Sequence, residues 1–96
     1  MPRMKSEEEI DNTVQSLQII PGVGPKLAKR FSDIGIRNVA DLKGKIPELL
    51  YSQMCATYGY LVDRCVLYVC RSSVYFAETE NPDPEKLKWR YWKDGN

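Results

Sequence analysis

Apolar residues recur every three or four positions along most of this chain, which is the spacing of an amphipathic helix. The clearest stripe is formed by Leu27, Ala28, Phe31 and Ile34, between two glycine-containing breaks. The pattern predicts an all-α domain of five to six short helices. We expect them at about residues 7–19, from Pro25 to near Ile34, around 39–42, from Pro47 past Met54, at 62–77, and after Pro84. The helix that begins at Pro47 has Leu49, Leu50 and Met54 as its apolar positions.

The expected helix ends coincide with residues that cap or break helices. Polar side chains that accept backbone amides, prolines that lack an amide hydrogen and glycines that adopt positive φ each mark an end. The markers are the capping box of Ser6 and Glu9 for the first helix, Pro21 and Gly22 at its end, Gly24 and Pro25 at the start of the second, Gly35 at its end, and Asn38 with Asp41 for the third.

The segment 61–77 is the most apolar stretch of the chain. Its apolar positions fall on more than one side of a helix, and such a helix is covered by neighbours. We therefore expect a central helix near 62–77, with a strand as the alternative because β-branched and aromatic residues are frequent there. The main stripe consists of Val62, Val66, Val69, Ser73 and Phe76, and Leu67 and Val74 add apolar surface elsewhere.

Length and composition favour one soluble domain over residues 1–96. The chain has 96 residues, 43% of them hydrophobic, which suits one small core. No apolar run approaches the ~20 residues that a membrane span requires. The N-terminal residues lack the apolar core of a signal peptide, so we expect a cytoplasmic protein with no membrane partner.

The residue types needed for catalysis or for a metal site are scarce. The chain has no histidine, and its three cysteines, Cys55, Cys65 and Cys70, do not follow the spacing of a metal site or disulfide framework. We interpret them as buried thiols, with no structural metal and no essential disulfide. No paired carboxylates stand at a recognisable spacing either, so we predict that the chain is not an enzyme.

The charge is distributed unevenly along the chain, although the net charge is only +1. The stretch 24–45 holds six basic residues and two acidic ones, and the stretch 86–93 holds four basic residues and no acidic one. A local basic field can steer an anionic partner. For the C-terminal group we favour a solvated face over a binding site.

The stretch IPGVGPK, residues 20–26, has two interpretations. It is a tight connection between two helices, or it is also a cradle for an anion, since a helix N-terminus has unpaired amides and attracts phosphate. Gly22 permits positive φ, and Gly24 leaves room for a nearby group. The donors that we expect to be free are the amides of Gly22, Val23, Gly24 and Lys26, with the side chains of Lys26 and Lys29 beside them.

The apolar and glycine positions from Leu17 to Ile36 resemble the helix-hairpin-helix DNA-binding motif, which would here span residues 14–36. The resemblance implies a SAM-like fold and sequence-independent contact with DNA phosphates, with no chemistry of its own. It assigns phosphate contact to Gly22, Val23, Gly24 and Lys26. Hairpins of this motif can also hold a monovalent cation through backbone carbonyls, and we expect no other cofactor.

Further positions widen the resemblance to nearly the whole chain. The chain beyond the hairpin resembles the bacterial pathogenicity locus family of small helix-hairpin-helix proteins. The positions that carry this resemblance are the run Asp63 to Tyr68, Arg71, the run 74–77, and the tail 82–96 with Trp89 and Trp92. The hairpin and the following helix at 39–42 are also similar to the C-terminal domain of competence regulators of the TfoX type.

The second half of the chain departs from the DNA-binding pattern. Helix-hairpin-helix domains that bind DNA well usually pair two hairpins, and residues 38–58 hold no second Gly-x-Gly. Affinity would then depend on basic flanks, on a homodimer that supplies the second hairpin, or on a protein partner. The alternative function is a protein–protein interaction module, an adaptor without DNA binding of its own.

Four residues, Arg64, Tyr68, Arg71 and Tyr75, recur at the spacing of one helix face. Such a face can stack bases or hold phosphates, which makes it a secondary basic and aromatic surface. Alternatively, it packs beneath Trp89 and Trp92, with the arginines paired to Glu78 or Asp63. We favour packing, because long amphipathic side chains often cover apolar surface.

Overall fold

The computed structural model describes residues 15–94, and within that range the chain is helical with no strand. The expectation of an all-α chain is therefore confirmed at this level. Residues 15–17 are helical, and the α-helices and 3₁₀ helices that follow are α2 (Pro25–Asp33), η1 (Val39–Leu42), α3 (Pro47–Tyr58), α4 (Arg64–Glu78), η2 (Pro84–Leu87) and η3 (Trp89–Trp92). The proposed capping box of Ser6 and Glu9, and the expected helix before residue 15, lie outside the described residues.

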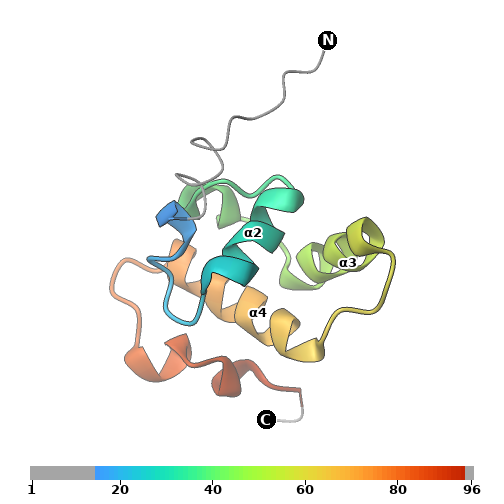
Figure 1. Ribbon diagram of the computed structural model, residues 1–96. Coiled ribbons are helices and arrows are strands. Elements are labelled where there is room, and N and C mark those ends of the chain that lie inside the picture. Colours follow the sequence, from blue (N-terminus) through green and yellow to red (C-terminus); the bar gives the residue numbers. More distant parts are fainter. Residues whose placement is uncertain (1–14, 95–96) are drawn as a thin grey trace.

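Helix α4 lies where the sequence predicted the central helix, and it packs against α3, η1, η2 and η3 (Figure 1). It begins two residues after the predicted start because Asp63 caps it, accepting the amide of Cys65 at 2.9 Å. Leu67 and Val74, outside the main stripe, are buried as well. The apolar residues on several sides of α4 are thus explained by neighbours on several sides.

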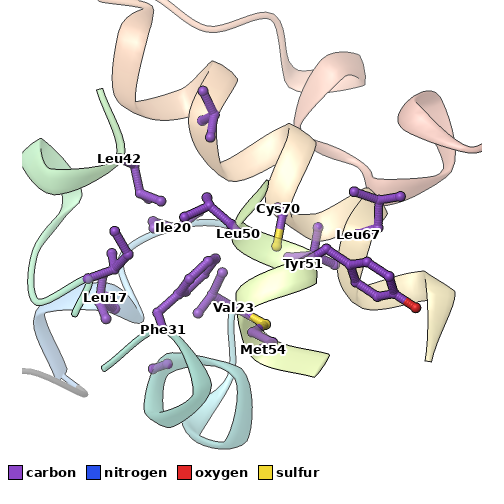
Figure 2. Packing of buried hydrophobic residues seen from close by; sticks show 14 of the residues in the cluster. Leu17, Ile20, Val23, Phe31, Leu42, Leu50, Tyr51, Met54, Leu67 and Cys70 are labelled. Carbon is purple, nitrogen blue, oxygen red and sulfur yellow. The ribbon is translucent and has the colours of Figure 1, made fainter. Parts of the chain in front are cut away.

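One core joins the segment before α2 with α2, η1, α3 and α4, and Figure 2 shows its members converging from these parts of the chain. Phe31 of α2 is fully buried. Leu50 and Met54 of α3 lie one turn apart on the same face and are buried too. The Tyr51 hydroxyl donates to the carbonyl of Val62, which ties α3 to the start of α4.

The predicted helix ends agree with the structure at most positions. Gly24 is the N-cap of α2 and Pro25 its first residue. Gly35, at φ +91, follows the end of α2, and its amide donates to Ser32 while that of Ile36 donates to Phe31. This pair of bonds is a Schellman motif. The Asn38 side chain caps η1 by accepting the amide of Asp41 at 3.0 Å.

Several predicted details are wrong. The first helix ends at residue 17 instead of Ile19, because the amide of Ile20 donates to Leu17 and closes a turn. Leu49 is 57% exposed, since it lies about 100° around α3 from the buried Leu50. Cys65 is exposed in the first turn of α4 instead of buried. The helix expected after Pro84 consists of two separate 3₁₀ helices, η2 and η3.

Candidate nucleic-acid interface

The hairpin loop, residues 20–26, is anchored by two apolar side chains. Ile20 and Val23 are 1% and 5% exposed, and the amide of Val23 donates to the carbonyl of Ile20 at 3.0 Å. The two residues between them, Pro21 and Gly22, are exposed. Gly22 has φ +87, a conformation that a residue with a Cβ adopts only with strain. The core therefore fixes both sides of an exposed turn.

Free amide groups follow this turn. Gly24 has an extended backbone, φ −90 and ψ −176, and Pro25 contributes no amide hydrogen. The amides of Gly22, Gly24, Lys26 and Leu27 have no acceptor among residues 15–94. Amides of this kind at a helix N-terminus attract anions because they carry a partial positive charge.

The prediction that the Val23 amide is free is wrong. Its hydrogen bond to Ile20 closes the turn, and its side chain belongs to the core (Figure 2). Leu27, which was predicted only as part of an apolar stripe, has an amide without an acceptor in the described part of the chain. Its position in the first turn of α2 is the signal that points to it, since the first helical amides have no partner within the helix.

Space above Gly24 is open. A Cβ built at this residue would meet no atom within 4 Å, and its φ of −90 is ordinary for any residue. The fold itself does not require glycine at this position. A ligand that approaches the backbone closely would require it, so the two demands on Gly24 can be separated by mutation.

Three basic side chains of α2 stand at helical spacing beside these amides. Lys26 is exposed and has no ion-pair partner among residues 15–94. Lys29, whose side chain is 65% exposed, pairs with Asp33 at 3.3 Å. The guanidinium of Arg30 lies 5.4 Å from the ring centroid of Tyr58. The ion pair of Lys29 with Asp33 is weak because it is exposed to solvent, so Lys29 can bind another anion at little cost.

The tyrosine beside Arg30 is fixed by its own hydrogen bond. Its hydroxyl donates to the carboxylate of Asp33. Burial and, next, that carboxylate raise the pKa of Tyr58 to about 12. Tyr58 is thus neutral at neutral pH and supports Arg30 and Asp33 from the end of α3.

The face of α4 formed by Arg64, Tyr68, Arg71 and Tyr75 lies beneath the C-terminal segment, residues 82–94. The ring of Tyr68 stacks on Trp89 with centroids 6.2 Å apart, and that of Tyr75 lies 5.6 Å from Trp92. Of the two alternatives for this face, packing beneath the tryptophans is the one observed.

The arginines of this face pair with residues other than those expected. Arg64 pairs with Asp94 at 2.7 Å, and Arg71 pairs with Asp94 at 2.9 Å and Glu48 at 3.1 Å. The expected partners are engaged elsewhere: Glu78 accepts the amide of Gly44, and Asp63 caps α4. The hydrogen bonds from Arg64 and then Arg71 lower the pKa of Asp94 to about 2.

The structure brings part of the C-terminal basic group to the hairpin loop. Lys88 and Arg90 line the same groove as Pro21 and Gly22, although they lie at opposite ends of the chain. The sequence analysis favoured a solvated face for this group. The signal that indicated a binding surface was that residues 86–93 hold no acidic residue and that their basic residues are interleaved with aromatic ones.

The remaining chemistry of the described residues is limited. No cluster of three or more histidine, cysteine, aspartate or glutamate side chains suited to a metal occurs within residues 15–94. All three cysteines are free, and burial raises the pKa of the Cys70 thiol to about 12. None of the helices described between residues 15 and 94 is long and apolar enough to cross a membrane.

Comparison with known proteins gives a family. The family model described as pathogenicity locus matches residues 10–96. A curated relative, the mitomycin resistance protein McrB of Streptomyces lavendulae, is 35% identical over 75 residues, which cover 78% of this chain and 69% of that protein. No solved structure matches. The chain therefore belongs to the pathogenicity locus family.

Proposed function

We propose that this member of the pathogenicity locus family binds DNA through the hairpin loop, contacting phosphates without reading the base sequence. The observation that carries the proposal is the group of amides, from Gly22, Gly24, Lys26 and Leu27, without acceptors among the described residues at one end of α2. Phosphate is the anion that such an arrangement suits in nucleic acid.

The architecture around the loop supports a helix-hairpin-helix assignment. A helical turn at residues 15–17 leads into the loop, and α2 leaves it, with Leu17, Ile20 and Val23 buried together. We infer that this is the hairpin of a helix-hairpin-helix domain with a SAM-like arrangement. The cation that the motif implies would be held by loop carbonyls. The Ile20 carbonyl already accepts the Val23 amide, and the phosphate contacts proposed here do not require a cation.

Basic side chains extend the surface on both sides of the loop. Lys26, Lys29 and Arg30 stand on α2, and Lys88 and Arg90 stand across the groove. This positive surface takes the place of the missing second hairpin in our proposal, and a homodimer would add another hairpin. Asp63, which lines a pocket with Lys26 and Arg30, marks its acidic border.

A salt titration of the whole 96-residue chain with labelled duplex DNA tests the proposal. If two or three phosphates are contacted, log affinity should fall with log salt at a slope of about −2 to −3, at ~0.9 per phosphate. The double variant Lys26→Glu and Lys29→Glu should weaken binding to unrelated sequences alike, because phosphate contacts do not specify sequence.

A matched control separates a local site from net charge. Lys43→Glu with Lys45→Glu changes the total charge equally, but these residues line other pockets, beside Glu78 and Leu49 respectively. We expect this control to retain most of the affinity. Equal losses in both double variants, or none in a folded Lys26 and Lys29 variant, would contradict the hairpin site.

Gly24 supplies a second arm of the test. Replacing Gly24 with Val should leave the chain folded, because the added side chain enters open space. The same side chain would stand above the free amides and keep a phosphate away from them. Loss of DNA affinity in a variant with an unchanged circular dichroism spectrum supports backbone contact, and full retention argues against it.

An adaptor function is the second candidate, and one observation favours it. Ile46 and Leu49 are 55% and 57% exposed, and they line a pocket together with Ile34 and Ile36. Exposed apolar side chains grouped in this way are typical of protein contacts. If the hairpin variants leave DNA affinity unchanged, this surface becomes the leading candidate, and Leu49→Asp should then abolish association with the protein partner.

A further inference from the structure

A groove of about 550 Å³ lies between the hairpin loop and the C-terminal segment. Figure 1 shows the loop that precedes α2 passing close to the first turn of that segment, drawn in orange. The volume is within the range of ~300–1,000 Å³ that small-molecule sites occupy. The residues that line it are Pro21, Gly22, Pro84, Leu87, Lys88, Trp89 and Arg90.

The aromatic wall of the groove is held in place from behind. Trp89 is half-buried, and its ring stacks on Tyr68 nearly in parallel, at 7° between planes. The indole nitrogen of Trp92 donates to the carbonyl of Lys86 at 2.7 Å, which fixes the backbone that carries Trp89. An aromatic ring that neighbouring side chains already hold loses little freedom when a flat ligand packs against it.

The charge of the groove matches an anionic chain. Its lining within residues 15–94 has two cationic side chains, Lys88 and Arg90, and no acidic one. Lys88 pairs with Glu85 at 3.2 Å, and both side chains are more than 60% exposed, so solvent screens this pair. The guanidinium of Arg90 lies 5.8 Å from the ring centroid of Trp89.

Gly22 belongs both to the groove and to the group of free amides. An anion held at those amides is therefore next to the apolar lining. A nucleotide has this combination, since its phosphate is charged and its base presents a flat π surface. In a paired duplex the base is stacked inside the helix, so only an unpaired or extruded base can enter.

We propose that this groove binds an unpaired nucleobase of a DNA strand whose phosphate is held by the hairpin loop. The base packs on Leu87 and Trp89, and Lys88 and Arg90 approach the flanking phosphates. The proposal rests on the proposed function and names its preferred substrate: DNA with an unpaired nucleotide, rather than a continuous duplex.

Three labelled DNAs of one sequence test this with the whole 96-residue chain. One is a paired duplex, one has a single unpaired nucleotide, and one has that nucleotide without its base. We expect the unpaired nucleotide to raise affinity at least about fivefold over its abasic counterpart, since aromatic stacking commonly contributes that much per base. The abasic DNA controls for the bend and the extra phosphate.

Variants locate the effect. Trp89→Ala should abolish the preference for the unpaired base and leave the affinity for paired duplex within about twofold. Trp89→Phe keeps a ring and should keep most of the preference, which guards against loss of folding in the alanine variant. Tyr91→Ala is the matched control, because this exposed residue of the same turn lines a different pocket, with Glu48 and Arg71.

The outcomes distinguish this inference from the proposed function. Equal affinities for the unpaired and abasic DNAs, with salt-dependent binding to both, would overturn the inference and leave the hairpin function intact. A groove that takes a segment of a protein would also give these equal affinities. Absence of binding to all three DNAs would overturn both.

Discussion

The hairpin loop and the C-terminal segment face each other across one groove, yet they are held in different ways. The loop is held by its own buried residues, Ile20 and Val23, and by a backbone hydrogen bond between them. The C-terminal segment has no fully buried side chain in η2 or η3. Aromatic rings and ion pairs attach it to α4.

This difference predicts different responses to perturbation. Contacts within a core are lost only when the whole domain unfolds, whereas exposed ion pairs and ring contacts can open locally. We expect damage to the loop anchors to lower global stability, and damage to the attachment of the C-terminal segment to release that segment while the rest stays folded. Four experiments test this difference between the two regions, each with its own control.

Removal of a loop anchor should have the largest effect. Ile20→Ala leaves a cavity in the core and should lower the free energy of unfolding by about 2–5 kcal/mol. The neighbouring Ile19→Ala is the control, because Ile19 is 64% exposed and should change stability by less than about 0.5 kcal/mol. Urea denaturation followed by circular dichroism measures both, and equal effects would contradict the anchoring role.

Backbone strain at Gly22 should have the second-largest effect on the free energy of unfolding. Gly22→Ala places a Cβ on a residue with φ +87 and should cost about 1–2 kcal/mol. Gly24→Ser is the control, since its φ is −90 and serine is a preferred N-cap residue, so stability should change by less than about 0.5 kcal/mol. The same denaturation experiment applies, and a stable Gly22→Ala variant would show that the turn adopts another conformation at no cost.

Loss of Arg71 should detach the C-terminal segment. Its side chain, 20% exposed, contacts Glu48, Asp94 and the carbonyl of Trp92. Arg71→Ala should remove about 1–2 kcal/mol of attachment, after allowance for the exposure of its partners. Hydrogen exchange at the Trp92 indole should accelerate while amides of α3 and α4 stay protected.

A more exposed arginine controls for charge. The side chain of Arg64 is 55% exposed and makes an ion pair with Asp94, so Arg64→Ala should have less effect on the Trp92 indole than Arg71→Ala. Simultaneous loss of protection throughout α3, α4 and the indole in the Arg71 variant would mean that the C-terminal segment unfolds only with the whole domain.

Lowering the pH should produce the smallest change, a weaker attachment of the C-terminal segment. Hydrogen bonds from Arg64 and Arg71 lower the pKa of Asp94 in the folded state to about 2, below the ordinary value of ~3.9. The carboxylate therefore favours the attached segment fully above about pH 4, and this contribution is lost as the pH falls through about 2. Tryptophan fluorescence should shift in that window before circular dichroism changes. In Asp94→Asn the shift in this window should be absent.

The sequence predicted the elements of α2 and α4 well, because their ends depend on neighbouring residues. Pro25 and Gly35 each act within one turn of their own position. The cap by Asp63 is equally local but was not predicted, and α4 begins two residues later than expected. Exposure was harder to predict. Leu49 and Cys65 are apolar residue types in apolar stretches, and only the placement of neighbouring helices leaves them on the surface.

The candidate site shows the same difference between features that local sequence predicts and features that depend on packing. Gly22, Gly24 and Lys26 were predicted from local pattern and lie at the exposed turn as expected. Val23 was assigned wrongly because its hydrogen bond to Ile20 depends on the exact turn that the core imposes. Their role in binding phosphate remains a prediction that the salt titration tests.

Local sequence alone predicts that the chain is helical and that residues 20–26 form an exposed turn before a helix. Proline and glycine restrict or extend backbone dihedrals locally, whatever the rest of the chain does. Tertiary packing, in contrast, places Trp89 and Lys88 across a groove from Pro21 and Gly22. That placement follows from ring stacking on Tyr68 and ion pairs to Asp94, which bring distant residues together in space. The spacing of Tyr68 and Tyr75 indicated the face of α4 that the tryptophans cover, but not that the same segment would lie across a groove from the hairpin loop.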